Sequence, residues 1–550
     1  MFIKRVNIFV TKVGKKNKSS KLLHKNYALC SKYLVNSNTL CTFAKILQSY
    51  EKKNYQTINI MNQQTEQGSK AYLISIVMVA VLGGLLFGYD TAVISGAEKG
   101  LQAFFMEAKD FAYTDGWHGF TSASALIGCI IGSALSGYLA TNLGRKKSLI
   151  VAGILFFISA LGSMDPEFMF FEYGQPTYSL LIMFNIYRII GGIGVGLASA
   201  ICPMYIGEVA PSNIRGMLVS WNQFAIIFGQ LVVYFVNFFI LGEHIQPLVE
   251  EMGKGIAAIN PAAQWTVTTG WRYMFGSEAV PAGLFALLIC FVPETPRYLV
   301  SIGQDNKALG ILSKINGSSK AAQILQDIKD TMVVKTEKLM TYGFMCIFIG
   351  IMLSVFQQAV GINAVLYYAP RIFGDMGMDD PMMLTVFMGI INITFTLVAV
   401  FTVEKWGRKP LLISGSLGMA LGAFGVAVTF GNESLSLVTA ASLLIYSASF
   451  MFSWGPICWV LIAEIFPNTI RGGAVAIAVA FQWISNFIVS SSFVPMFNMH
   501  LTEGDDFGHW FTYGLYGILC VVAALFVWKL VPETKGKTLE DMTKLWRNRQ

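Results

Sequence analysis

Charged residues are scarce in this sequence. Only 13% of its 550 residues are Asp, Glu, Lys or Arg, whereas 54% are hydrophobic and 13% are aromatic. Soluble domains carry about 25% charged residues, so this composition excludes a soluble globular protein. The aromatic content, without low-complexity polar tracts, also excludes an intrinsically disordered chain. We therefore expect most of the chain to lie in lipid.

Metal-binding and catalytic patterns are missing as well. The eight cysteines are scattered without a C-x-x-C pair, and the five histidines show no metal-ligand spacing. Neither a disulfide framework nor a zinc site is expected. No nucleophile–base set or phosphate-binding loop is recognisable. The sequence thus predicts no enzyme activity, no metal and no cofactor.

The net charge of +8 comes from the first sixty residues. They contain twelve Lys or Arg against one acid, Glu51, which leaves 28 basic and 31 acidic residues in the rest (40 − 12 and 32 − 1). No nucleic-acid binding is therefore indicated. Met61 followed by an apolar helix resembles a natural start, so residues 1–69 are expected to be an unstructured basic extension. N-terminal sequencing that finds Phe2 would contradict this hypothesis.

Long apolar segments dominate the remainder. A helix that spans a bilayer needs about 20 mainly apolar residues. Twelve segments qualify, at 71–96, 118–141, 148–164, 178–204, 216–241, 273–293, 341–368, 382–403, 410–430, 436–462, 472–497 and 509–531. A polar stretch that is typical of short surface helices separates the sixth from the seventh.

The two sets of six segments repeat each other. Gly-Arg-Lys-Lys at 144–147 matches Gly-Arg-Lys-Pro at 407–410, and Val-Pro-Glu-Thr occurs at both 292–295 and 531–534. A parallel repeat of this kind indicates two halves related by an axis along the membrane normal. The sequence predicts an all-α membrane protein with twelve transmembrane helices in two six-helix halves, 70–293 and 341–531. Cytoplasmic linker helices at 294–340 and a cytoplasmic tail at 532–550 complete it.

Basic residues in the short loops predict the orientation. Loops that follow odd-numbered segments are acidic, and the loops on the other side contain Arg145, Lys146, Lys147, Arg215, Arg297, Lys405, Arg408, Lys409 and Arg471. We therefore expect a multi-pass protein of the plasma (inner) membrane with both termini in the cytoplasm.

Two charged residues interrupt the apolar segments. Asp90 lies in the first segment and Arg188 in the fourth. A charge at the centre of a membrane helix costs about 2.5–3.5 kcal/mol, so each residue is the other's expected partner. Such a pair can act as a proton switch. The alternative is a permanent ion pair that only fixes helix packing.

Several motifs together resemble the sugar porter family of the major facilitator superfamily. They are Gly-Arg-Lys-Lys, the segments around Glu208–Gly216 and Glu464–Gly472, Pro293-Glu294-Thr295-Pro296-Arg297, Gln357-Gln358-x-x-Gly361-x-Asn363 and Pro532-Glu533-Thr534-Lys535-Gly536. The resemblance covers about residues 70–545 and is strongest to bacterial members that import D-xylose with protons. One departure is Thr141, where the family usually has an acid; the second copy keeps Glu404.

The resemblance implies a sugar site and a gate. The sugar site would comprise Phe87, Gln223, Gln230, Gln357, Gln358, Asn363, Tyr367, Asn392, Trp459 and Gln482. Amide side chains offer both donors and acceptors to sugar hydroxyls. For Gln230 or Asn392 alone, a helix–helix hydrogen bond is an equal alternative. Trp454, Trp483 and Glu278 are interpreted as packing or interfacial residues. The cytoplasmic gate would comprise Arg145, Glu208, Arg215, Glu404, Arg408, Glu464 and Arg471.

The sequence thus predicts a proton-coupled importer of a monosaccharide, most closely D-xylose, with Asp90 as the proton acceptor and Arg188 as its partner. The expected partners are a monosaccharide, a proton and the lipid bilayer. A passive facilitator with the same site and a non-transporting sugar sensor are the alternatives. Asp90 argues against the facilitator, and the short tail argues against the sensor.

Overall fold

The computed structural model describes residues 68–212, 214–241, 264–331, 337–467, 469–501, 507–536 and 539–548. The hypotheses about residues 1–67, including a start at Met61, lie outside these ranges. Within them, every regular element is a helix. The first half contains α4 (Lys70–Met106), α5 (Asp115–Asn142), α6 (Arg145–Met164), α7 (Tyr178–Val209), α8 (Arg215–Leu241), α11 (Trp271–Ser277) and α12 (Ala279–Leu288).

The second half follows a group of shorter helices. These are α13 (Pro296–Ser301), α14 (Asp305–Asn316) and α15 (Ser318–Thr331), within the predicted linker. The second half contains α16 (Phe344–Ala359), α17 (Ile362–Tyr367), α18 (Ala369–Asp375), α19 (Pro381–Trp406), α20 (Arg408–Thr429), α21 (Ser436–Phe452), α22 (Trp454–Ile465), α23 (Arg471–Phe497) and α24 (Phe507–Leu530). A last helix, α25 (Leu539–Arg547), follows it.

Eleven helices in the described ranges are long and apolar enough to cross a membrane. The sixth predicted segment is the exception, because it is divided at Glu278 into α11 and α12. Pro281 explains the division: it has no backbone N–H to donate to the carbonyl of Ser277 one turn earlier. A π-helical turn at Thr266–Gly270 precedes α11, so this segment begins earlier than predicted.

The seventh and tenth segments are also divided. Gly361 has a left-handed backbone (φ 89°) between α16 and α17, which glycine adopts without steric cost. The tenth segment breaks at Ser453, between α21 and α22. Pro456 explains this break, because it has no backbone N–H to donate to the preceding turn.

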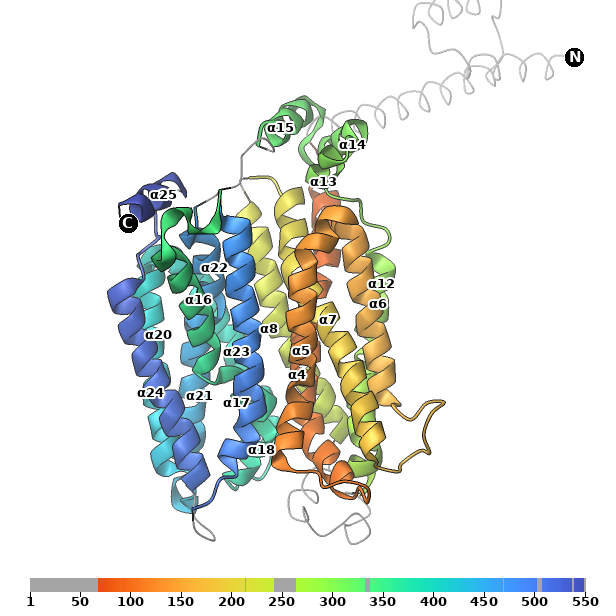
Figure 1. Cartoon of the computed structure of the whole chain (residues 1–550), viewed down its shortest axis with the longest axis vertical. Coiled ribbons are helices and arrows are strands. Elements are labelled where there is room, and N and C mark those ends of the chain that lie inside the picture. Colours follow the sequence, from red (N-terminus) through yellow and green to blue (C-terminus); the bar gives the residue numbers. More distant parts are fainter. Residues whose placement is uncertain are drawn as a thin grey trace, which may run out of the picture. The chain divides into compact units, whose positions relative to one another are not determined.

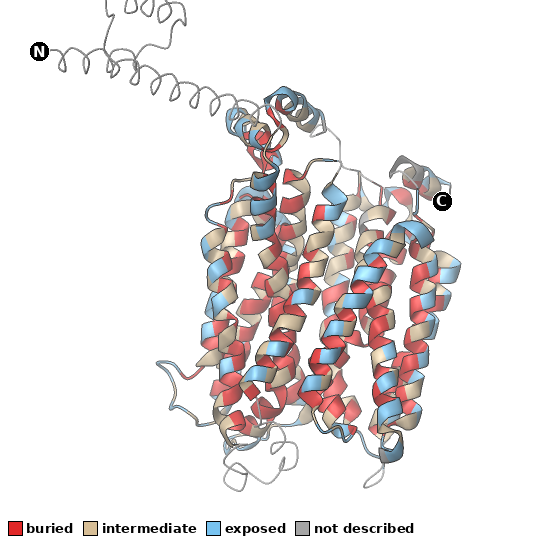
Figure 2. Cartoon of the chain, turned by 180° about the vertical axis from the view of Figure 1, so that it is seen from behind, coloured by how far each residue is buried: buried red, intermediate tan, exposed pale blue. Residues whose placement is uncertain are grey.

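The two halves pack side by side, with the linker helices and α25 beyond one end of the bundle (Figure 1). We call this the linker end and the other the opposite end. Between the halves, α5 packs along α23, α8 along α19, and α4 against α17 and α18. Buried residues lie inside each half and between the halves, whereas the exposed residues point outward (Figure 2).

The outward face of the bundle is apolar. Phe401, Leu421 and Val428 have exposed fractions of 72%, 69% and 78%. Such side chains would aggregate in water but match lipid tails. The polar groups therefore gather inside, where the bilayer offers no competing hydrogen bonds.

Candidate functional site

A cavity lies between the two halves, at the level where α16 and α21 are interrupted. Nine of the ten predicted sugar-site residues are on its wall: Phe87, Gln223, Gln230, Gln357, Gln358, Asn363, Tyr367, Trp459 and Gln482. They come from α4 and α8 in the first half and from α16, α17, α22 and α23 in the second. The cavity thus draws on both halves.

The left-handed turn at Gly361 assembles the polar part of this wall. It brings Asn363 back beside the end of α16, where Asn363 Nδ2 donates to Gln358 Oε1 at 2.6 Å. The amide of Gln358 in turn donates to Gln357 Oε1. Gln482 Nε2 on α23 donates to the same oxygen at 2.8 Å. Four neutral amides therefore form one connected chain along the cavity.

Several polar atoms of the wall have no protein partner. Gln230 Oε1, Gln482 Oε1 and Trp483 Nε1 are buried and make no hydrogen bond to the described part of the chain. A buried polar group without a partner is costly, about 1–3 kcal/mol. Two acceptors and one donor of this kind suit a ligand with several neutral hydroxyl groups.

Asn392 is the predicted site residue that does not line the cavity. It is buried on α19, and its Oδ1 accepts a hydrogen bond from Ser447 Oγ at 2.7 Å. In this conformation Asn392 thus forms the helix–helix hydrogen bond that the sequence left as an alternative, and its place in the sugar site stays a prediction.

Sequence reasoning missed several residues of the wall, among them Trp483, Asn486 and Thr91. Helical spacing was the available signal, since Asn486 is four residues after Gln482 and Thr91 four after Phe87. Trp483 was interpreted as packing only, but its ring contacts Phe87 with centroids 5.6 Å apart. Trp454, in contrast, packs away from the cavity and donates from Nε1 to Ser416 Oγ at 2.7 Å.

Asp90 and Arg188 form the predicted pair. Arg188 Nη1 donates to Asp90 Oδ1 at 2.6 Å, and the side chains are 2% and 0% exposed. Neither residue is on the cavity wall, although Thr91 and Phe87 on the same helix are. Asp90 Oδ2 has no hydrogen-bond partner among the described residues. The pair is thus shielded from both lipid and cavity.

Glu278 joins this pair from the first half's divided helix. It is 1% exposed and interacts electrostatically with Asp90 and with Arg188. Its interpretation as an interfacial residue was therefore wrong. Glu278 thus places a second carboxyl group within electrostatic reach of the Arg188 guanidinium. The guanidinium also lies over the Phe275 ring, 4.9 Å from its centroid.

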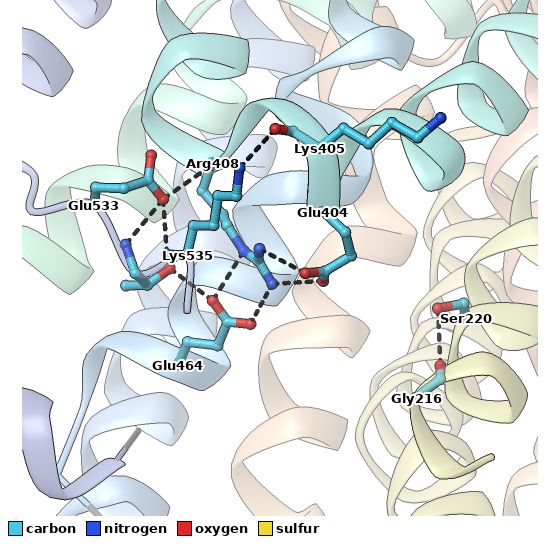
Figure 3. Close-up of polar contacts among 9 residues, drawn as sticks. Gly216, Ser220, Glu404, Lys405, Arg408, Glu464, Glu533 and Lys535 are labelled. Atoms are coloured by element: carbon cyan, nitrogen blue, oxygen red, sulfur yellow. Dashed lines mark hydrogen bonds and ion pairs between the residues drawn. The ribbon is translucent and has the colours of Figure 1, made fainter. Parts of the chain in front are cut away.

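A second charged network lies at the linker end of the second half (Figure 3). Arg408 Nη2 contacts Glu404 Oε1 and Glu464 Oε1, both at 2.8 Å. Its Nη1 and Nε donate to the other oxygens of the same two carboxylates, at 3.2 and 3.1 Å. Thr534 Oγ1 also donates to Glu464 at 2.7 Å. The network ties the ends of α19, α20 and α22 together.

The matching network of the first half is weaker. Arg145 Nη2 contacts Glu208 Oε1 at 2.7 Å, and Arg145 Nη1 donates to the Ala140 carbonyl at 3.0 Å. Thr141 lies at the position equivalent to Glu404, but its hydroxyl donates to the Gly137 carbonyl of its own helix. Arg145 therefore has one carboxylate partner where Arg408 has two. Arg145 Nε and Glu208 Oε2 are buried without a hydrogen-bond partner among the described residues.

Two predicted gate residues stay outside these networks. Arg215 donates to the Ala210 carbonyl at 3.4 Å. No ion pair within the described ranges joins Arg215 or Arg471 to an acid, and Arg471 Nε and Nη2 are buried without a partner there. Each network moreover connects helices of one half only, so in this conformation neither holds the two halves together.

Two carboxylates cap helix N-termini, one at the start of α20 and one at the start of α6. Glu533 accepts from the backbone N–H groups of Arg408 at 3.0 Å and Lys409 at 2.9 Å, and Glu294 accepts from that of Arg145 at 3.1 Å. Burial raises the pKa of Glu533, but four backbone donors outweigh it and hold this pKa below its usual value. For Glu294 burial prevails over its donors, and the pKa is raised.

A bundle of two repeated six-helix halves around a central polar cavity defines a solute transporter of the major facilitator fold. The family model described as "Sugar (and other) transporter" matches residues 76–546. The chain belongs to this sugar transporter family, and its fold is the one that the sequence predicted.

Named relatives agree with the family. The D-xylose-proton symporter of Escherichia coli (strain K12) is 50% identical over 493 residues, covering 87% of this chain and 97% of the relative. The inward open conformation of the E. coli xylose transporter XylE has a TM-score of 0.74 and 48% identity, covering 86% of this chain and all of that one. A glucose facilitated diffusion protein of Zymomonas mobilis is 33% identical, covering 88% of this chain and all of the relative.

Proposed function

We propose that this protein is a proton-coupled symporter that imports a monosaccharide, most closely D-xylose, by alternating access. The observation that carries the proposal is the cavity with its chain of four neutral amides and its three unpartnered polar atoms. Neutral donors and acceptors suit sugar hydroxyls, and Phe87, Trp459 and Trp483 offer apolar faces to the C–H surface of the ring. The similarity to the E. coli D-xylose-proton symporter, at 50% sequence identity, supports xylose as the substrate.

In this proposal the Asp90–Arg188 pair carries the proton. Protonation neutralises the Asp90 carboxylate, so Arg188 loses its counterion at 2.6 Å and the helices that hold the two residues are free to shift. Thr91 follows Asp90 directly and lines the cavity, so a shift of α4 reaches the sugar site. Glu278 provides a second acid to share the guanidinium.

The proposal includes the domain division and the orientation. The two halves, 70–293 and 341–531, would rock about the cavity, with the linker 294–340 and the tail 532–550 in the cytoplasm. The basic loops around Arg145 and Arg408 support an orientation with the linker end inside the cell, in the plasma (inner) membrane. The charges Arg145, Glu208, Arg215, Glu404, Arg408, Glu464 and Arg471 would form the inner gate when the cavity opens outward.

Proteoliposome uptake tests the function. We expect purified protein to concentrate labelled xylose when the outside is acid, with unlabelled glucose as competitor. Asp90→Asn removes the titratable group and keeps the side-chain shape, so it should retain sugar counterflow and lose accumulation. Accumulation by the Asn variant would contradict the role of Asp90.

A passive facilitator is the second candidate, because a relative is named for facilitated diffusion of glucose. A facilitator would only equalise the sugar concentration across the membrane, and an imposed pH gradient would not change its uptake. The buried ion pair beside the cavity favours the symporter, since intramembrane ionisable residues commonly form proton pathways.

A further inference from the structure

A buried charged network at the opposite end of the bundle is not explained by sugar binding or by the Asp90–Arg188 pair. At its centre is Glu98, a carboxylate on α4 that is 0% exposed. Arg371 on α18 donates from Nε to Glu98 Oε1 at 3.1 Å and contacts Oε2 from Nη2 at 2.9 Å. His118 on α5 contacts the same Oε2 from Nε2 at 2.9 Å. One carboxylate thus has two cationic or titratable partners.

These three residues come from different halves. Glu98 and His118 belong to α4 and α5 in the first half, whereas Arg371 belongs to α18 in the second. Two more contacts bridge the halves nearby: Lys99 with Asp375 at 3.5 Å, and Asn498 Nδ2 with Asp115 Oδ2 at 2.9 Å. The Arg371 guanidinium therefore acts as a latch that must leave Glu98 when this end opens.

The hydrogen bonds around His118 are complete for a neutral ring. Its Nε2–H donates to Glu98, and its Nδ1 accepts from the Tyr113 hydroxyl at 3.1 Å. The charge of Glu98 is already balanced by Arg371, which is always protonated. A second positive charge in this site, which is fully closed to solvent, would be unfavourable. In the closed state His118 is therefore neutral.

Opening reverses this balance. When the halves rock apart, Arg371 moves away with α18, while Glu98 and His118 stay together on α4 and α5. The Glu98 carboxylate then lacks a cation, and a proton on His118 restores a neutral pair. We propose that His118 is a second proton-binding site, which exchanges a proton for the Arg371 guanidinium when the opposite end opens.

The other groups around His118 do not supply this cation. Tyr368, beside α18, faces the ring with centroids 6.3 Å apart. Asp115 acts on it electrostatically from α5, as Arg371 does from α18. Lys99 contacts Asp375 in the closed state, and it stands next to Glu98 on α4, where side chains one residue apart do not face each other. Gln102 accepts from Arg371. Tyr368 and Gln102 are neutral, and Asp115 also favours a protonated His118.

By linkage, a proton that binds only the open state must favour that state in acid. The inference rests on the proposed function only in calling this end the outer one. If the opposite end faces the outside, acid outside the cell favours the state in which this end is open to the incoming sugar. The ratio of open to closed protein should rise as pH falls through the His118 titration, by at most about tenfold per pH unit for one proton.

The test measures the distance between nitroxide labels at Met106 and Met383, by pulsed electron paramagnetic resonance in nanodiscs. The two side chains are exposed, at 52% and 61%, and lie on different halves at the opposite end. Asp90→Asn in the background removes the other proton site. The exposed Cys290 and the two cysteines within residues 1–67 are replaced by serine.

We expect the longer-distance population to grow between about pH 8 and pH 5.5, and the growth to disappear in His118→Gln. Glutamine keeps an N–H donor for Glu98 but takes up no proton; His118→Asn replaces it if that protein does not fold. The matched control His500→Gln, at an exposed histidine of the same end, should keep the full response.

An unchanged response in His118→Gln, or none in the parent, would overturn the proposal. A response moved to more acid pH would assign the proton to Glu98 instead and would also overturn it. Failure of wild-type accumulation would reject the symporter alone, since the distance measurement needs neither sugar nor transport.

Discussion

Thr141→Glu is expected to stabilise the first half by completing its charged network. Thr141 precedes Arg145 by four residues, as Glu404 precedes Arg408 in the second half. In both halves the two positions lie on consecutive helices, at the end of one and the start of the next, and a glycine with positive φ (Gly144 at 90°, Gly407 at 93°) makes the turn between them. Glu404 contacts two nitrogens of Arg408, at 2.8 and 3.2 Å, so a glutamate at 141 has a geometric template in the same molecule.

The size of the effect follows from exposure. The side chain of Glu404 is 72% exposed and that of Arg408 is 7% exposed, and Thr141 is likewise exposed. Exposed ion pairs contribute about 0.2–1 kcal/mol, and a two-point contact to a guanidinium favours the upper part of this range. We therefore expect Thr141→Glu to add about 0.5–1 kcal/mol to the free energy of unfolding, and Glu404→Thr to remove a similar amount.

Equilibrium unfolding in mixed micelles with increasing SDS measures this difference, and a double-mutant cycle isolates its cause. On an Arg145→Gln background the gain from Thr141→Glu should vanish, because the new carboxylate has lost its partner. High salt should reduce the gain, since the pair is exposed. An equal gain with and without Arg145 would refute the reasoning and leave helix propensity or loop charge as the cause.

Three further predictions concern the helix starts and the sugar site. Glu533→Gln should lower the free energy of unfolding by about 1–2 kcal/mol near pH 7, because the amide nitrogen cannot accept the Lys409 N–H. Since the pKa of Glu533 is lowered on folding, its contribution is present above its unfolded pKa of about 4.3 and is lost as pH falls through the folded value, so the variant and wild type should converge in acid. Glu294 has a raised pKa, so Glu294→Gln should lower the free energy of unfolding by less than Glu533→Gln does at neutral pH. Thermal unfolding of both variants and of wild type, at neutral and at acid pH, measures these differences. Gln357→Leu removes the oxygen that accepts from both Gln358 and Gln482, and should weaken xylose binding about tenfold or more in a calorimetric titration. Ser447→Ala, which removes a hydroxyl that donates to Asn392 off the cavity wall, should change xylose binding little.

The fold was predictable because the membrane leaves few choices. Apolar length alone placed the spans, and the starts of α7, α19 and α23 fall within one residue of the predicted segments. Backbone chemistry explains the interruptions at Gly361 and Pro456, but the break at Gly361 was not predicted. The division of the sixth span at Glu278 was missed, although Pro281 carries the same signal as Pro456, because the apolar run continues across it.

The site was harder to predict where a side chain can face either the cavity or a neighbouring helix. Amides grouped within one segment, such as Gln357 and Gln358, could be assigned to a site, since their number exceeds what one helix contact requires. Asn392 and Trp483 could not be assigned, because which way a membrane helix faces depends on its packing partners. Glu98 and Arg371 are 273 residues apart, and no local pattern connects them.

The positions of the charges imply how protons and sugar are coupled. The cavity wall offers neutral amides and hydroxyls, whereas Asp90, Arg188 and Glu278 lie buried off that wall. In the proposed mechanism sugar and proton therefore bind different atoms, and coupling has to pass through helix movement. α4 is the element suited to this, because it holds Asp90 and presents Thr91 to the cavity. Such coupling is reciprocal: a proton that strengthens sugar binding must itself bind more tightly when sugar is present.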